Sequence, residues 1–308
     1  MKLEGIHHIT AITGDAPRNV DFYVRVLGLR MVKKSVNQDD PTVYHLFYAD
    51  ELGSAGSDLT FFEYPNARPG RAGAGMVHRI AHRVASAATL DFWADRLGSE
   101  GVETARVDGA LRFADPEGLE HELVVADVPD APLTARSTEV PPEHALQGFH
   151  AVDALVPSAA RSGAMVTGLL GFEARGEDAY EARGASRGGT IRFQSTRERG
   201  FGGAGTVHHI AWATLYDEHA AWRERVAAER QVTPVIDRFY FRSAYFREPG
   251  GILYELASIG PGFATDEPHE TLGESLALPP DFERLRAQVE PLLTPLPDVR
   301  QWRPAPVS

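Results

Sequence analysis

One unit recurs four times along the sequence, and this repetition limits the possible folds more than any other feature. Each copy opens with a short apolar segment that has a histidine at its second position. These segments are IHHITAIT (6–13), VHRIAHRV (77–84), FHAVDALV (149–156) and VHHIAWAT (207–214). The first histidines, at positions 7, 78, 150 and 208, are 71, 72 and 58 residues apart. The composition and length of these segments predict β-strands.

A segment with helical spacing follows each predicted strand. VDFYVRVLG (20–28) and LDFWADRLG (90–98) have matching apolar residues and both stop at glycine, which predicts amphipathic helices that end at Gly28 and Gly98. Further helices are expected at about 158–170 and about 217–228.

The ends of the units also match. DPEGLEHELVV (115–125) and EPGGILYELAS (248–258) each place a Pro/Gly turn before a strand, with a glutamate four residues after the last glycine. These glutamates are Glu122 and Glu255. Runs such as TVYHLFYAD (42–50) and LTFFEY (59–64) predict further strands between helix and unit end.

Each unit is therefore expected to be a strand, a helix and three strands. Such a unit cannot close its own sheet and needs a partner. The sequence predicts an α+β fold in which four βαβββ modules form two cup-shaped barrels. The segment 127–144 divides the chain into an N-terminal domain (1–140, modules 1 and 2) and a C-terminal domain (145–260, modules 3 and 4). We interpret 261–308, with a helix near 280–292, as a covering extension.

Composition limits the chemistry and the partners. The 308 residues include no cysteine, so any metal must be held by nitrogen and oxygen ligands. A formal charge of -12 argues against nucleic-acid binding, which needs a basic surface. No stretch approaches the roughly 18 apolar residues of a membrane span, and the opening MKLEGIHHIT lacks the apolar core of a signal peptide. We expect a cytoplasmic protein, and assembly as a homo-oligomer is compatible with the sequence.

Strand geometry restricts which histidines can meet. Neighbouring side chains in a strand face opposite ways, so only one of His7 and His8, and one of His208 and His209, points into a cup. The inward positions of the four units are either His7, His78, His150 and His208, or His8, Arg79, Ala151 and His209. The second register is the more informative, because histidine then occurs in units one and four alone.

In that register, Glu255 faces His8 and His209. Two histidines and one carboxylate with open positions are typical of non-haem Fe(II) oxygenases, and these ligands also suit Mn(II). The three residues can meet only if modules 1 and 4 share a barrel, which leaves modules 2 and 3 to form the other. The second barrel is expected to be inert, with an ion pair between Arg79 and Glu122 in place of the metal.

The chain resembles the vicinal oxygen chelate superfamily (glyoxalase, bleomycin resistance protein and extradiol dioxygenase), and more narrowly its hydroquinone ring-cleaving dioxygenases. The segments that carry the resemblance include HHIT, FYADELG, HHIA and PGGILYE. The resemblance implies paired βαβββ modules and the metal ligands His8, His209 and Glu255. It also implies supporting roles for Thr10, His208, Arg238 and Tyr245.

The activity that the resemblance implies is oxygen-dependent cleavage of a hydroquinone-type or catechol-like aromatic, with Fe(II) as cofactor and Mn(II) as the alternative. Arg238 would offset negative charge, His208 would move protons and Tyr245 would hydrogen-bond the substrate. Two other functions remain open on this fold. A glyoxalase-type isomerase or lyase would need a fourth ligand, for which Glu63 is the candidate, and a binding protein would sequester a small aromatic without turnover.

Overall fold

The computed structural model describes residues 1–305 and contains the four expected modules, each with a strand, a helix and three strands. Module 1 comprises β1 (Ile6–Thr13), α1 (Ala16–Val20), β2 (Arg30–Asn37), β3 (Asp40–Ala49) and β4 (Asp58–Glu63). Module 2 comprises β5 (Met76–Val84), α2 (Ala87–Ser99), β6 (Thr104–Val107), β7 (Ala110–Ala114) and β8 (Glu120–Val125).

The second half of the chain repeats this order. Module 3 comprises β9 (Phe149–Val156), α3 (Ala159–Gly168), β10 (Glu173–Gly176), β11 (Ala179–Arg183) and β12 (Gly188–Ser195). Module 4 comprises β13 (Thr206–Thr214), α4 (His219–Ala227), β14 (Ile236–Asp237), β15 (Arg242–Arg247) and β16 (Leu253–Ser258).

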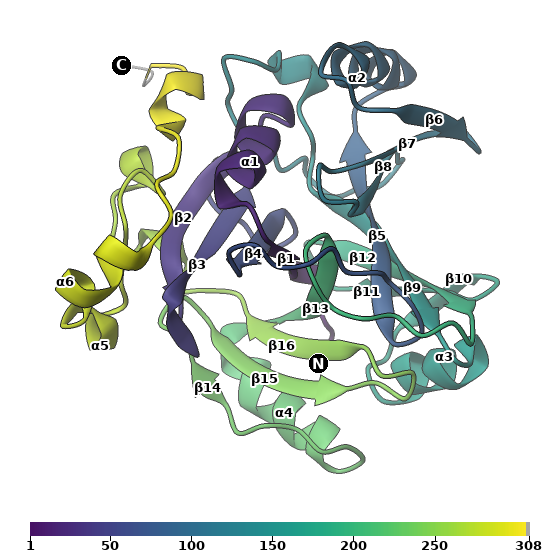
Figure 1. Ribbon diagram of the computed structural model, residues 1–308. Helices are drawn as coiled ribbons and strands as arrows, with labels where there is room; N and C mark the ends of the chain where they lie inside the picture. The colour runs from purple at the N-terminus through teal and green to yellow at the C-terminus, as the bar shows by residue number, and fades with distance from the viewer. Residues whose placement is uncertain (306–308) are drawn as a thin grey trace.

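The strands form two sheets of eight, and their order confirms the α+β fold and the predicted pairing of modules. The first sheet runs β14-β15-β16-β13-β1-β4-β3-β2 and joins module 4 to module 1. The second sheet runs β10-β11-β12-β9-β5-β8-β7-β6 and joins module 3 to module 2. At the centre of each sheet the opening strands of its two modules pair antiparallel, β1 with β13 and β5 with β9 (Figure 1). The domain boundary at 140–145 stays a prediction.

The helix ends differ in detail from the expected ones. After α1 the chain continues as a π-helical segment to Val26, and Gly28 follows with a φ of +70°. A Cβ on Gly28 would lie 2.7 Å from Val140, so glycine is required there. In contrast, α2 continues through Gly98, and the left-handed residue is Gly101 with a φ of +74°. The expected helix end at Gly98 is wrong, because the last turn of a helix tolerates a glycine and Gly101 supplies the stop.

The acidic residue that begins each repeated Pro/Gly turn connects the sheets. Asp115 accepts a hydrogen bond from Leu119 N within its own turn and another from the Tyr23 hydroxyl of module 1, at 2.8 and 2.9 Å. Glu248 accepts from Ile252 N at 3.0 Å and from the Ser162 hydroxyl of module 3 at 2.7 Å. In both cases one carboxylate closes the turn and holds the helix of the preceding module, which belongs to the other sheet.

Residues beyond 260 lie along the outer side of β2, as the yellow segment in Figure 1 shows. Ala277 N donates to Lys34 O at 2.9 Å, and the segment thereby covers the exposed edge of the first sheet. The expected helix near 280–292 is two short helices, α5 (Pro280–Glu283) and α6 (Arg286–Val289). The last three residues of the 261–308 extension lie outside the described residues. Within residues 1–305, no helix has the length and apolarity needed to cross a membrane.

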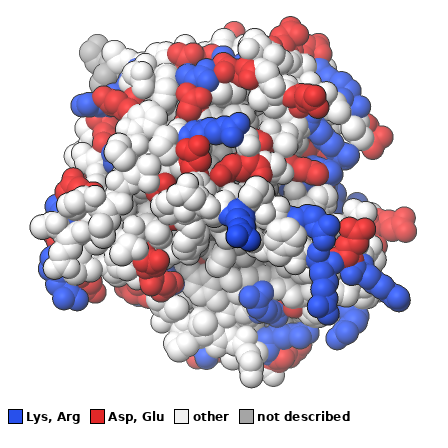
Figure 2. Space-filling model, viewed as in Figure 1, with Lys and Arg blue, Asp and Glu red and all other residues white. Residues whose placement is uncertain are grey.

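Figure 2 shows basic side chains interspersed with acidic ones, most densely at the right of the view, where the second sheet lies. The arginines on β10, β11 and β12 are ion-paired: Arg175 with Glu181, Arg183 with Asp130, and Arg192 with Glu122.

Candidate metal centre

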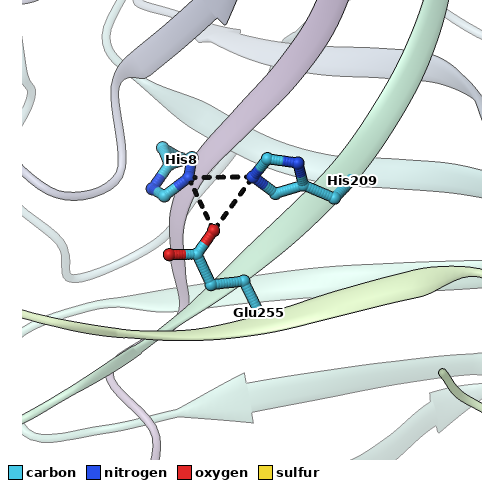
Figure 3. Close-up of side chains that lie close together, drawn as sticks. All are labelled: His8, His209 and Glu255. Carbon is cyan, nitrogen blue, oxygen red and sulfur yellow. Dashed lines mark hydrogen bonds and ion pairs between the residues drawn. The ribbon is translucent and has the colours of Figure 1, made fainter. Parts of the chain in front are cut away.

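Three adjacent strands of the first sheet, β1, β13 and β16, bring His8, His209 and Glu255 together (Figure 3). Glu255 Oε2 lies 3.2 Å from His8 Nε2 and 2.9 Å from His209 Nε2, and the two Nε2 atoms are 3.3 Å apart. All three side chains are buried, and their ligand atoms lie within 4.8 Å of one another. Among the described residues, no other group of three His, Cys, Asp or Glu side chains meets this criterion.

The hydrogen bonds of His7 indicate where His8 carries its proton. His7 Nε2 lies 3.2 Å from the carbonyl oxygen of Ser258, which can only accept, so this nitrogen donates. Burial lowers the pKa of His7 to about 3, so the ring is neutral and its Nδ1 is an acceptor. His8 Nδ1, 2.9 Å away, must then donate to it, which leaves the lone pair of a neutral His8 on Nε2. This lone pair faces Glu255.

Glu255 is ionised in this arrangement. Burial alone would raise its pKa, but His8 and His209 outweigh burial and hold the pKa of Glu255 well below its usual range. Although burial opposes the shift, Glu255 raises the pKa of His8, so without a metal a proton on the imidazole balances the carboxylate. A divalent cation would take the place of this proton, with neutral imidazole nitrogens and the carboxylate as its ligands. Two nitrogen donors and one oxygen donor, with no thiolate available, fit a divalent metal such as Fe(II) or Mn(II).

His8 and His209 line a cavity of about 460 Å³. Six Phe and Tyr side chains line it: Phe47, Phe62, Tyr64, Tyr240, Phe241 and Tyr245. A cavity of this size that combines aromatic walls with polar side chains fits a small aromatic molecule with polar substituents.

The structure also brings the four other predicted residues to this cavity or to its metal ligands. Thr10 Oγ1 lies 3.1 Å from His209 Nε2, and His208 Nδ1 lies 2.8 Å from His209 Nδ1. The ring of Tyr245 meets that of His209 edge-on, with centroids 5.7 Å apart. Burial, with a further contribution from Glu255, raises the pKa of Tyr245, so its hydroxyl keeps its proton and can donate.

Arg238 lies at the same cavity wall, with its guanidinium 5.9 Å from the centroid of the Tyr245 ring. Asp39, at the tip of the β2–β3 hairpin, pairs with Arg238 at 2.9 Å and is largely exposed. Arg238 therefore contributes a positive charge to the cavity and also anchors the hairpin that forms part of its rim.

The expected ion pair between Arg79 and Glu122 is wrong. Arg79 pairs with Glu120 at 2.6 Å and with Asp153 at 2.9 Å. Glu122 is held instead by Arg112 and Arg192, each at 2.8 Å. The sequence pattern could not reveal this exchange, because Arg112 and Arg192 reach Glu122 from β7 and β12. We still expect no metal ion in the second sheet, since positive guanidinium groups surround Glu122, which corresponds to Glu255.

Glu63 does not join the metal centre. It follows Phe62 on β4, and Phe62 lines the cavity, so the side chain of Glu63 points to the other face. Its carboxylate accepts a hydrogen bond from Thr294 in the C-terminal extension at 2.8 Å.

Sequence reasoning assigned no role at the site to His7, His45 or Ser35. His45 and Ser35 line the cavity from β3 and β2. The alternation of His45 with Phe47 in TVYHLFYAD was visible, but it did not reveal which face of the strand is turned toward the metal ligands.

Comparison with known proteins agrees with this fold. Residues 5–123 match the family model described as Glyoxalase/Bleomycin resistance protein/Dioxygenase superfamily. The chain is 38% identical to the Bacillus subtilis (strain 168) protein named "Putative ring-cleaving dioxygenase MhqA", over 96% of this chain and all of that protein. It is 32% identical to the "Chlorohydroquinone/hydroquinone 1,2-dioxygenase" of Sphingobium indicum, over 94% of this chain and 95% of that protein.

Two solved structures extend the comparison. A crystal structure described as a putative dioxygenase from Bacillus subtilis has a TM-score of 0.87 and 39% identity, and the match covers 96% of this chain and 98% of that chain. Glyoxalase I from Zea mays has a TM-score of 0.59 and 16% identity, with 83% of this chain and 92% of that chain covered, which is a likeness of fold alone.

Paired βαβββ modules around a buried His-His-Glu group define a metal-binding class of this fold. The chain belongs to the glyoxalase/bleomycin resistance protein/dioxygenase superfamily, the vicinal oxygen chelate proteins, and within it to the group of relatives named ring-cleaving dioxygenases.

Proposed function

We propose that this chain is a non-haem Fe(II)-dependent dioxygenase that cleaves the ring of a hydroquinone-type aromatic with O2. The observation that carries the proposal is the buried group of His8, His209 and Glu255 beside an aromatic-lined cavity of about 460 Å³. The names of the full-length relatives, one of them a hydroquinone 1,2-dioxygenase, support the reaction class. In a 1,4-diol no two hydroxyl-bearing carbons are adjacent, so intradiol cleavage is excluded, and we infer extradiol-type cleavage of the bond beside one hydroxyl-bearing carbon.

The residues around the cavity would have different roles in the reaction. Fe(II) held by this ligand set supplies open coordination positions and the redox chemistry that O2 activation requires. Arg238 would stabilise the negative charge of the ionised substrate within an apolar cavity, where such charges interact strongly. Tyr245 would donate a hydrogen bond from its hydroxyl.

His208 would hold and transfer a proton beside the metal centre. Partial burial, with His209 and Arg247 nearby, lowers its pKa to about 4. The ring is therefore neutral at pH 7, and because its Nδ1 accepts from the Nδ1–H of a metal-bound His209, its Nε2 carries the single proton.

Anaerobic loading with Fe(II), followed by oxygen uptake on addition of a panel of hydroquinones and catechols, tests the proposal. We expect one O2 consumed for each hydroquinone cleaved, and loss of uptake in Glu255→Ala. An absence of uptake with every diol of the panel by the loaded protein would refute the proposal. If Glu255→Ala retained full affinity for the aromatic while the wild type showed no turnover, the chain would be a binding protein.

The position of Glu63, the candidate fourth ligand of an isomerase, disfavours that alternative: it follows the cavity-lining Phe62 on β4, and its carboxylate accepts from Thr294. Manganese remains a possible native metal, and the same assay after Mn(II) loading decides between the two ions.

A further inference from the structure

Two cavity-lining side chains of the first sheet lie side by side and have no role assigned to them in the metal centre. Ser35 on β2 and His45 on β3 are direct cross-strand partners, so their side chains emerge side by side. Ser35 is 3% exposed, and within residues 1–305 its hydroxyl has no hydrogen-bond partner. A buried hydroxyl without a partner is costly, which makes this position a candidate for ligand binding.

The ring of His45 is held in a fixed position. It lies between Phe47 and Phe62, with ring centroids 3.9 and 4.4 Å away. Its Nε2 bonds Thr60 Oγ1 at 2.9 Å, and the Thr60 hydroxyl donates to Thr10 Oγ1 at 2.8 Å. Since the Thr60 proton is engaged with Thr10, Nε2 of His45 is the donor to Thr60.

This bond fixes the other nitrogen of His45 as an acceptor. Burial lowers the pKa of His45 well below its ordinary value, so the ring is neutral and carries its single proton on Nε2. Nδ1 then has a free lone pair and, among the described residues, no hydrogen-bond partner. Ser35 offers a donor and His45 an acceptor, and a phenolic hydroxyl can satisfy both.

Ser35 and His45 lie on other strands of the cavity wall than the metal ligands. In the first sheet the ligands are on β16, β13 and β1, whereas His45 and Ser35 are on β3 and β2, beyond β4. The contacts from His209 through Thr10 and Thr60 to His45 limit this separation, because each is a single hydrogen-bond distance. An aromatic ring with one oxygen at the metal ligands would direct a second oxygen in the 4-position to the far side.

We propose that Ser35 and His45 form the binding site for the substrate hydroxyl that is remote from the metal, and that the cavity thereby selects 1,4-diols over phenols and 1,2-diols. The inference rests on the proposed function in taking an aromatic diol as the ligand. A catechol has both oxygens at one end of its ring and would leave Ser35 and His45 unpaired. Sites that hydrogen-bond a substrate hydroxyl discriminate strongly against analogues that lack it.

The test measures binding without oxygen, by calorimetry with hydroquinone, phenol and catechol, on Fe(II)-loaded protein. We expect the wild type to bind hydroquinone at least about ten-fold more tightly than phenol. Ser35→Ala and His45→Gln should each weaken hydroquinone binding by about three- to ten-fold and leave phenol binding within two-fold.

Two further variants sharpen the test. The amide of glutamine reaches the Nε2 position of the histidine it replaces and that of asparagine reaches the Nδ1 position, so His45→Asn should retain more of the hydroquinone preference than His45→Gln. Leu253→Val is the matched control, because it alters the cavity wall without removing a polar group and should affect both ligands equally.

Equal losses for hydroquinone and phenol in Ser35→Ala and His45→Gln, or no loss for either ligand, would overturn the proposal. Oxygen uptake keeps this result separate from the proposed function. If the wild type cleaves hydroquinone but the variants keep its preference, the Ser35–His45 site is wrong and the dioxygenase stands. If the preference depends on both residues but no diol is cleaved, the site stands and the dioxygenase is wrong.

Discussion

His7 determines which ring nitrogen of His8 carries the proton, through contacts at its own two ring nitrogens. The Ser258 carbonyl fixes the proton on Nε2, and Nδ1 then accepts from His8. His8 can thus present an unprotonated Nε2 to a metal without ionisation of either ring. Hydrogen bonds of this kind orient a ligand imidazole and increase its basicity.

His7→Phe should therefore weaken Fe(II) or Mn(II) binding by about 10- to 100-fold, since His8 loses the acceptor for its Nδ1 proton. Equilibrium dialysis against a competing chelator measures the change. His78→Phe is the matched control, because His78 occupies the repeat-equivalent position in module 2, and we expect wild-type affinity. Unchanged affinity in His7→Phe would contradict the proposed proton arrangement.

At the scale of elements, β2 depends on the C-terminal extension for its burial. The Lys33 side chain is fully buried, and its ammonium group pairs with Asp266 at 2.7 Å and with Glu267. Tyr240, which lines the cavity, donates to Asp266 at 2.9 Å. The extension therefore supports the cavity wall as well as the sheet edge.

Lys33→Met should lower the free energy of unfolding by about 3 kcal/mol, because two carboxylates lose the cation that they share. Urea denaturation measures this effect. Lys34→Met is the control for loss of a neighbouring charge: the Lys34 ammonium contacts the Glu274 carbonyl at 3.2 Å, and we expect a cost below about 1 kcal/mol. Similar costs for both variants would show that the Lys33 cluster has no special role.

At the scale of the whole molecule, two sheets of one topology differ in what they can bind. The position of His209 is taken by Arg79 in the second sheet, and Arg112 and Arg192 hold the carboxylate of Glu122. We predict one Fe(II) per chain, measured by elemental analysis after Fe(II) loading and desalting. His209→Ala should reduce this ratio to near zero, whereas Glu122→Gln should leave it at one. A ratio of two would show that the second sheet also binds metal.

The two sheets are also joined by buried histidines. His82 Nε2 lies 3.0 Å from His121 Nδ1, and His121 Nε2 lies 3.0 Å from the Tyr23 hydroxyl of module 1. Burial lowers the pKa of His82 from 6.5 to about 4. The unfolded chain therefore binds more protons than the folded protein between these pH values, so stability is lost as the pH falls through this range.

We expect the free energy of unfolding to fall by roughly 3 kcal/mol from this residue between pH 7 and pH 4. His82→Gln keeps an amide near the Nε2 position but cannot titrate, so its stability should decrease less over the same range. Chemical denaturation of both proteins in chelator, at several pH values, measures the difference. Parallel curves for wild type and variant would contradict this origin of acid sensitivity.

The sequence by itself determined the repeated module and the residues that meet at the metal centre. Apolar periodicity and Pro/Gly turns are local properties, so four strand–helix–strand units could be predicted without a fold. The contrast of His8 and His209 with Ala151 and Arg79 at equivalent positions then selected the candidate ligands. Because ligands of one ion must lie together, it also predicted the pairing of modules 1 and 4.

Tertiary structure alone decided which partners reach across the sheets. Arg112 and Arg192 replaced the expected Arg79 at Glu122, Glu63 bonded Thr294 on the face away from the cavity, and Ser35 lay beside His45 in the cavity wall. Each of these contacts joins different strands or distant segments, and it depends on strand register and on the path of the extension. Periodicity records the face of a strand that a residue occupies, but it contains no information about the neighbour that the register places opposite.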